Sequence, residues 1–120
     1  MMATQNRIIE GIKTNSSNEN FYDDGVLRVE YDNYYIAVRG ELLRLQRTEF
    51  LVLSHLVQRS KRFVSGEELW NRVWGNQRAF SAMSIRVYVS QVRQLLEPFG
   101  IKIENMPTIG YRFIPYSKSP

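Results

Sequence analysis

The stretch from Ser81 to Glu97, SAMSIRVYVSQVRQLLE, constrains the fold more strongly than any other part of the chain. At about 100° of rotation per residue, one arc of a helix collects its large apolar side chains. These are Ile85, Tyr88, Val89, Val92, Leu95 and Leu96. The opposite arc collects Arg86, Ser90, Arg93 and Gln94, and no acidic residue occurs before Glu97. The pattern predicts a long helix with one face on a core and hydrogen-bond donors on the other face.

Donors of this kind suit phosphates and base edges, so one interpretation is a helix that lies in a nucleic-acid groove. The alternative is an ordinary amphipathic helix whose polar face is simply solvated. The features of the rest of the chain are needed to distinguish these two interpretations.

Size and composition narrow the choice. The chain has 120 residues, of which 43% are hydrophobic, and this size favours one globular domain. The absence of cysteine excludes a disulfide framework and thiolate chemistry, and it is compatible with the cytoplasm, where we expect the protein to act. The apolar runs are too short to span a bilayer, so we expect no membrane contact within this chain.

The net charge of +4 is unevenly distributed. Residues 1–25 carry two bases and four acids, which leaves 14 bases and 8 acids in residues 26–120. A domain with a net charge of +6 is suited to a polyanionic partner, although many enzymes are equally basic.

The chain divides into three parts. Residues 1–25 are weakly patterned and include the polar run TNSSNEN, so we predict a flexible N-terminal arm or linker. We predict a folded domain over residues 26–116 and a short tail over residues 117–120. The domain begins with three short apolar runs, at residues 27–31, 34–38 and 42–45, which predict an antiparallel scaffold sheet.

Two further helices are predicted before Ser81. The first runs from about Arg47 to Arg59, with apolar residues at helical spacing. The second begins at a capping box, in which the Ser65 hydroxyl accepts the Glu68 N–H and the Glu68 carboxylate reaches back to the Ser65 N–H, and it ends at Gly75.

After the long helix, residues 101–105 and 111–115 predict a β-hairpin with Gly110 near its tip. The fold class is therefore α+β: an N-terminal antiparallel sheet, three helices and a C-terminal β-hairpin wing. A helix-turn-helix places its second helix in the major groove, and a hairpin that follows it can reach a neighbouring groove or the backbone.

From about Leu27 to Phe113 the chain resembles the DNA-binding effector domain of OmpR/PhoB-type bacterial response regulators, a winged helix-turn-helix found in two-component systems. The matching pieces are Arg47-Thr48-Glu49-Phe50, the run VSGEELWNRVWG from Val64 to Gly75, Ile85 through Leu96, and Gly110-Tyr111-Arg112-Phe113. The resemblance implies sequence-specific binding of double-stranded DNA by a transcription regulator.

The resemblance also implies particular residues. Major-groove positions are Arg86, Tyr88, Ser90, Gln91, Arg93 and Gln94, and phosphate-contacting positions are Trp74 and Ser84. Pro107, Thr108 and Tyr111 match wing positions at the minor groove or its backbone. The loop that contains Asn76, Gln77 and Arg78 matches a segment that contacts RNA polymerase. We also expect a homodimer on repeated half-sites, because one module of this size buries little DNA surface.

Some positions depart from the family pattern. Ser90, Gln91 and Gln94 stand where relatives commonly carry bases, and the Pro107-Thr108 wing is similar to the proline-bearing wings of ToxR-like regulators. Fewer cations release fewer counterions, so we expect a shallow salt dependence of binding. The 25 residues before the domain are too few for a receiver domain. The sequence leaves open a fragment of a longer regulator, including a membrane-anchored one, and a stand-alone regulator.

The sequence shows no acid pair, Ser-His or Cys-His arrangement or glycine-rich phosphate loop, and the single His55 has no ligand cluster beside it. We therefore expect no catalysis, no cofactor and no metal. A second hypothesis is a protein-interaction module on the same scaffold. In that case the exposed face of the third helix, or the loop around Arg78, would bind RNA polymerase or a cognate regulator.

Overall fold

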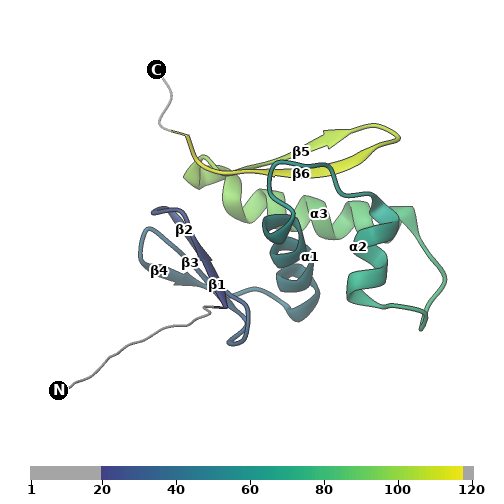
Figure 1. The fold of residues 1–120 in the computed structure, drawn as a ribbon, viewed down its shortest axis with the longest axis horizontal. Coiled ribbons are helices and arrows are strands. Elements are labelled where there is room, and N and C mark those ends of the chain that lie inside the picture. The colour runs from purple at the N-terminus through teal and green to yellow at the C-terminus, as the bar shows by residue number, and fades with distance from the viewer. Residues whose placement is uncertain (1–19, 118–120) are drawn as a thin grey trace.

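A computed structural model describes residues 20–117 of the chain. It begins with a four-stranded antiparallel sheet in the order β1-β2-β3-β4. Three α-helices and a two-stranded hairpin follow (Figure 1). The strands of the sheet are β1 (Phe21–Asp23), β2 (Leu27–Glu30), β3 (Tyr35–Val38) and β4 (Glu41–Leu43). The remaining elements are α1 (Arg47–Gln58), α2 (Gly66–Val73), α3 (Ala82–Leu96), the short 3-10 helix η1 (Glu97–Phe99), β5 (Lys102–Met106) and β6 (Gly110–Ile114).

The α+β fold class expected from the sequence is confirmed. The hairpin β5–β6 runs along α3, while the N-terminal sheet and α2 lie on opposite sides of α1 (Figure 1). An isolated bridge between Val64 and Tyr111 adds the segment before α2 to the edge of β6, with N–H to carbonyl distances of 2.7 and 2.8 Å in the two directions. The hairpin is therefore held to the helix-turn-helix by backbone hydrogen bonds.

The predicted boundary between arm and domain at residue 26 is wrong, because the sheet already begins at Phe21. Strand β1 pairs with β2, and the Tyr22 ring packs edge-on against Phe113 of β6 with 5.9 Å between ring centroids. Asp24 stabilises the following turn by accepting the N–H groups of Val26 and Leu27 at 2.9 and 2.8 Å. The rest of the predicted arm, residues 1–19, and of the tail, residues 118–120, lies outside the described residues.

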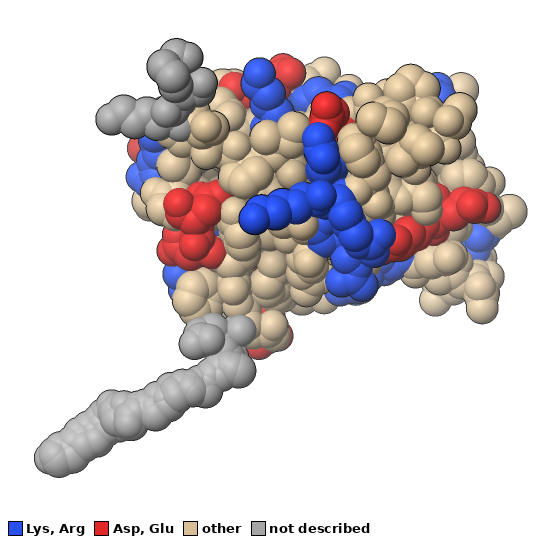
Figure 2. All heavy atoms as spheres, turned by 45° about the horizontal axis from the view of Figure 1, so that its top comes forward, with Lys and Arg blue, Asp and Glu red and all other residues tan. Residues whose placement is uncertain are grey.

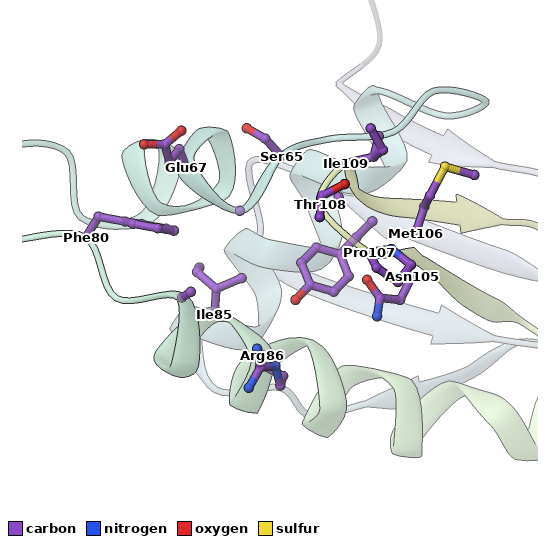
Figure 3. A pocket seen from close by; sticks show the side chains of 14 residues that line it. Ser65, Glu67, Phe80, Ile85, Arg86, Asn105, Met106, Pro107, Thr108 and Ile109 are labelled. Atoms are coloured by element: carbon purple, nitrogen blue, oxygen red, sulfur yellow. The ribbon is translucent and has the colours of Figure 1, made fainter.

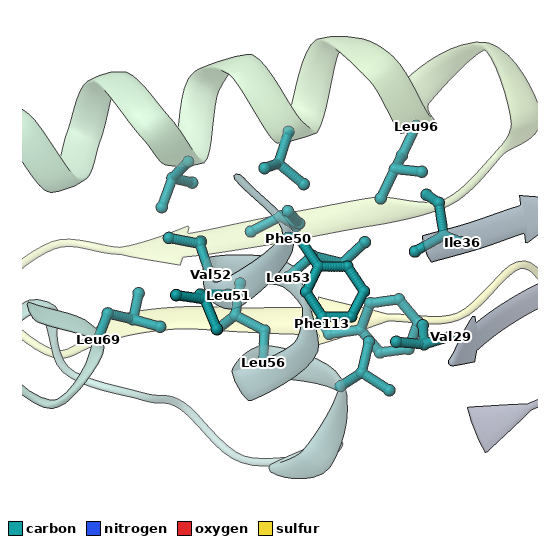
Figure 4. Packing of buried hydrophobic residues seen from close by; sticks show 14 of the residues in the cluster. Val29, Ile36, Phe50, Leu51, Val52, Leu53, Leu56, Leu69, Leu96 and Phe113 are labelled. Carbon is teal, nitrogen blue, oxygen red and sulfur yellow. The ribbon is translucent and has the colours of Figure 1, made fainter. Parts of the chain in front are cut away.

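One core joins every layer of the domain (Figure 4). Helix α1 lies at its centre, and all residues from Glu49 to Val57 are buried. Val29 and Ile36 reach this core from the sheet, Leu69 from α2 and Phe113 from β6. Because a large share of the buried surface lies on α1, this helix fixes the positions of α3 and the hairpin relative to each other.

The predicted capping box at the start of α2 is half right. The Ser65 hydroxyl accepts the Glu68 N–H at 3.0 Å, as expected. The Glu68 carboxylate does not complete the box, because its Oε2 lies 2.6 Å from His55 Nε2 and also pairs with Arg59 and Arg62. His55, which has no ligand cluster beside it in the sequence, therefore acts as a buried link between α1 and α2.

Candidate nucleic-acid interface

Helix α3 has two opposite rows of side chains at the same spacing. The inward row consists of Ile85, Val89, Val92 and Leu96, and all four side chains are buried. Shifting this row by two residues, or about 200° of rotation, gives the outward row Met83, Val87, Ser90 and Gln94. Serine at the N-cap, Ser81, starts the helix by accepting the Ser84 N–H at 3.2 Å.

The outward row combines two chemical types. Met83 and Val87 are 68% and 47% exposed, while Ser90 is half-buried and Gln94 is exposed. None of these four side chains carries a charge. The polar face predicted from the sequence is thus polar in its C-terminal half and apolar in its N-terminal half.

Arg86 lies beside this row and faces a cleft between α3, the start of α2 and the hairpin (Figure 3). The cleft has a volume of about 410 Å³, and its lining includes Arg86, Pro107, Thr108 and Tyr111. The structure therefore brings the predicted helix residue and the predicted wing residues to one surface. Thr108 sits at the exposed hairpin tip with a positive φ of 67°, so the turn itself sets its position.

Arg93 does not extend into solvent as the sequence-based interpretation required. Its Nε and Nη2 atoms donate to the carbonyl oxygen of Ile103 at 3.1 and 3.0 Å, and the residue is half-buried. Two of the three guanidinium nitrogens are therefore bound to the protein's own hairpin. The expectation that Arg93 reads base edges is not supported by this geometry, which instead fixes β5 against α3.

Gln91 and Tyr88 also lie on the flanks of α3 rather than on its outward row. Gln91 lines a hollow with Gln46 and Glu49 at the start of α1, and its buried Oε1 atom has no hydrogen-bond partner among residues 20–117. Tyr88 is half-buried, and its ring centroid lies 5.7 Å from that of Trp74. If α3 lay in a nucleic-acid groove, these two side chains would face the backbone at its edges and not the bases at its floor.

An aromatic cluster fixes the connection between α2 and α3. Trp74 packs on Trp70 with 4.2 Å between ring centroids, and Phe80 contacts Trp70 edge-on at 5.8 Å. The indole N–H of Trp70 donates to the Arg78 carbonyl at 2.9 Å, while the Arg78 guanidinium lies 5.1 Å from the Trp74 ring centroid. The loop with Asn76, Gln77 and Arg78 is exposed, yet both ends of it are tied to the helices.

Basic side chains also gather away from α3. Figure 2 shows Lys and Arg side chains in a band across the middle of the face that carries the hairpin, with acidic groups towards both ends. Several bases close to the hairpin have acidic partners: Arg112 pairs with Glu104, and Arg59 and Arg62 pair with Glu68. The His55 hydrogen bond, followed by the neighbouring arginines, lowers the pKa of Glu68, so this carboxylate stays ionised and offsets their charge.

Sequence reasoning missed three exposed residues at this surface. Met83 and Val87 belong to the outward row, and Asn105 lines the cleft next to the hairpin turn. The first two could have been found by rotating 200° from the buried row, instead of collecting only the polar side chains. Asn105 gives no comparable signal, because its exposure depends on the hairpin register.

A helix-turn-helix, a wing held to it by backbone hydrogen bonds and an N-terminal sheet define a winged helix-turn-helix domain. Over residues 40–113 the chain matches the family described as "Transcriptional regulatory protein, C terminal", and it belongs to that family. The OmpR/PhoB-type relationship expected from the motifs is confirmed.

Two bacterial regulators with similar sequences support this family assignment. The response regulator ArlR of Staphylococcus haemolyticus is 24% identical over 105 residues, covering 86% of this chain and 48% of that protein. The regulatory protein VxrB of Vibrio cholerae is 34% identical over 77 residues, covering 64% of this chain and 31% of that protein. The chain thus spans about half the length, or less, of these relatives.

Among solved structures, the DNA-binding domain of RstA from Klebsiella pneumoniae, in complex with the RstA box, superposes with a TM-score of 0.71. It is 21% identical, and the match covers 82% of this chain and 100% of that one. This likeness shows a shared fold. In the described part of the chain, residues 20–117, no helix has the length and apolar character needed to cross a membrane.

Proposed function

We propose that this domain binds double-stranded DNA in a sequence-specific manner, as part of a bacterial transcription regulator. The observation that carries the proposal is the outward row of α3 lying beside the Arg86 cleft and the hairpin tip. A major groove about 12 Å wide admits one helix, here α3. The hairpin lies next to α3, across the cleft. Family membership supports the same function.

The side chains divide by their chemistry. Arg86, Ser90 and Gln94 are exposed or half-exposed donors that suit base edges in the groove. Trp74, Ser84, Tyr88 and Gln91 lie on the flanks, where they suit the sugar-phosphate backbone. Thr108 and Tyr111, with Pro107, would contact the backbone or the minor groove beside α3. Arg93 is proposed as a positioning residue that aligns the hairpin.

Two further partners form part of this proposal. A homodimer on repeated half-sites would supply the second module that a small interface needs for tight binding. RNA polymerase would contact Asn76, Gln77 and Arg78, because this loop is exposed and its Arg78 is anchored to the Trp70 and Trp74 rings. The proposed function requires no catalysis or cofactor, and we propose that the domain acts in the cytoplasm, where bacterial DNA lies.

A second candidate function is favoured by one observation. Phe80, Met83 and Val87 are 45%, 68% and 47% exposed at the N-terminal end of α3, and exposed apolar residues can mark a protein interface. In this case α3 would bind a protein partner instead of DNA.

Selection of bound sequences from a pool of random duplexes tests the proposal. We expect a short motif to be enriched, and the selected duplex to resist competition by unrelated DNA. Arg86→Ala should weaken binding to the selected site about 5- to 150-fold, which corresponds to about 1–3 kcal/mol.

The control for Arg86→Ala is Arg28→Ala, which removes an equal charge from β2, where Arg28 pairs with Asp23. This control should bind like the unmodified chain. A pool without any enriched sequence would contradict DNA recognition and favour the protein-interaction module.

A further inference from the structure

Met83 and Val87 form the N-terminal half of the outward row of α3, where a groove-binding helix meets the bases. They lie one helical turn apart and are 68% and 47% exposed. Burial within the domain cannot explain their apolar character. Valine also forms helices slightly less well than the straight-chain residues that usually occupy exposed positions. Their chemistry therefore calls for a partner with an apolar group at the same place.

The floor of the major groove offers one apolar group, the C5-methyl of thymine. Valine is suited to it, because its two methyl groups stand in one strongly preferred rotamer in a helix. Methionine is flexible and polarisable, so Met83 can adapt to a methyl group at a less fixed distance. Cytosine presents an amino group at the corresponding edge, which an apolar side chain would desolvate without a hydrogen bond.

Resting on the DNA-binding function proposed above, we propose that Val87 and Met83 select thymine through contacts with its C5-methyl group. The two side chains are four residues apart, or about 6 Å along the helix, close to two base-pair steps of about 3.4 Å. The site should therefore carry thymines about two base pairs apart opposite the N-terminal half of α3. Ser90 and Gln94 continue the row and would read polar edges beyond them.

Double-stranded DNA is the occupant that the surroundings favour. The apolar pair continues without interruption into Ser90 and Gln94, and exposed Arg86 lies between the two apolar positions in sequence on the side of the cleft. A single helix face thus offers methyl groups, hydrogen-bond donors and one cation. This mixture matches base edges and phosphates.

The test uses the 120-residue chain and the duplex recovered by selection. Each thymine is replaced in turn by deoxyuridine, which lacks only the methyl group, and the dissociation constant is measured for the unmodified chain and for Val87→Ala and Met83→Ala. We expect uridine at one or two positions to weaken binding by the unmodified chain about three- to fivefold, as for one buried methyl group. Val87→Ala should bind the thymine duplex less tightly by a similar factor. At one of these positions, replacing thymine by deoxyuridine should no longer change its dissociation constant.

Leu42→Ala is the control, because Leu42 is an equally apolar side chain, 70% exposed on the N-terminal sheet. It should keep the full response to uridine. The inference is overturned if no thymine distinguishes Val87→Ala or Met83→Ala from the unmodified chain while that chain still binds its selected duplex. Failure to select any duplex would instead contradict the proposed DNA-binding function itself.

Discussion

The Arg93 guanidinium donates two hydrogen bonds to the carbonyl oxygen of Ile103, at 3.1 and 3.0 Å, and so joins α3 to the base of the hairpin. A basic residue of α3 is thus hydrogen-bonded to the protein's own backbone. Its effect on DNA binding would be indirect, through the position of the hairpin next to the groove.

Arg93→Ala should lower the free energy of unfolding by about 1–3 kcal/mol, because the Ile103 carbonyl loses a charged donor. Binding should weaken to a similar degree for all DNA sequences. Chemical denaturation measures the first effect and repeated selection the second. The neighbouring Gln94→Ala is the control, since Gln94 is exposed: its stability should change by less than about 0.5 kcal/mol while its preferred sequence changes. A changed sequence preference for Arg93→Ala, without loss of stability, would show that Arg93 reads bases.

The sequence predicted the buried parts of α3 well and its flanks poorly. Ile85, Val89 and Val92 repeat at a helical period, and burial of such a row follows from the pattern alone. Arg93 lies near the border of that row, where a long side chain can reach either solvent or a neighbouring carbonyl. Whether Arg93 reaches solvent or a carbonyl depends on where the hairpin lies, and this position cannot be derived from helical periodicity.

In α2 and β1 as well, local sequence patterns predicted contacts between near neighbours but not contacts between distant parts of the chain. The Ser65 cap needs only residues three positions apart and was predicted correctly. Glu68, in contrast, turns to His55, which lies 13 residues earlier on α1. Strand β1 was missed because Tyr22 is anchored by Phe113 of β6, a contact between opposite ends of the domain.

Gly110 should tolerate no side chain. A Cβ atom added there would lie 2.1 Å from the Val64 carbonyl oxygen, because the hairpin and the segment before α2 are in direct backbone contact. We expect Gly110→Ala to cost more than about 2 kcal/mol of the free energy of unfolding, measured by urea denaturation, and to weaken DNA binding.

Gly40→Ala is the matched control for this experiment. Gly40 also has a positive φ, of 85°, but a Cβ atom there would have no neighbour within 4 Å. We expect a cost of about 1 kcal/mol from backbone strain alone. Equal costs at the two glycines would contradict the close packing of the hairpin on Val64.

The link between Glu68 and His55 predicts a pH dependence of stability. The pKa of Glu68 is lowered in the folded state, first by the His55 hydrogen bond, so the folded protein binds this proton less readily than the unfolded chain. The stabilisation is therefore present above the unfolded pKa of about 4.3 and is lost as the pH falls through the lowered pKa.

Glu68→Gln should reduce the free energy of unfolding by about 1–2 kcal/mol at pH 7. The difference from the unmodified chain should shrink as the pH falls below about 4. Thermal unfolding at a series of pH values measures this difference, with the exposed neighbour Glu67→Gln as the control. A difference that stays constant down to pH 2 would show that the Glu68 charge is not involved.

Salt should weaken DNA binding only moderately. The outward row of α3 has no charged side chain, and Arg93 is bound to Ile103, which leaves Arg86 as the exposed cation on this helix among the described residues. Because each neutralised phosphate contributes about −0.9 and α3 offers few free cations, a plot of log K against log salt concentration should have a slope no steeper than about −3. Fluorescence anisotropy at several salt concentrations gives this slope. A value as steep as about −8 would show a much larger basic contact surface.

The most direct test of the central claim is an NMR titration of the ¹⁵N-labelled chain with the selected duplex. The claim is that α3 and the hairpin tip form the DNA-binding surface. We predict the largest amide shifts at residues 83–94 and 105–111, with little change in the sheet at residues 27–43. Large shifts in the sheet, with α3 and the hairpin tip unaffected, would contradict the account.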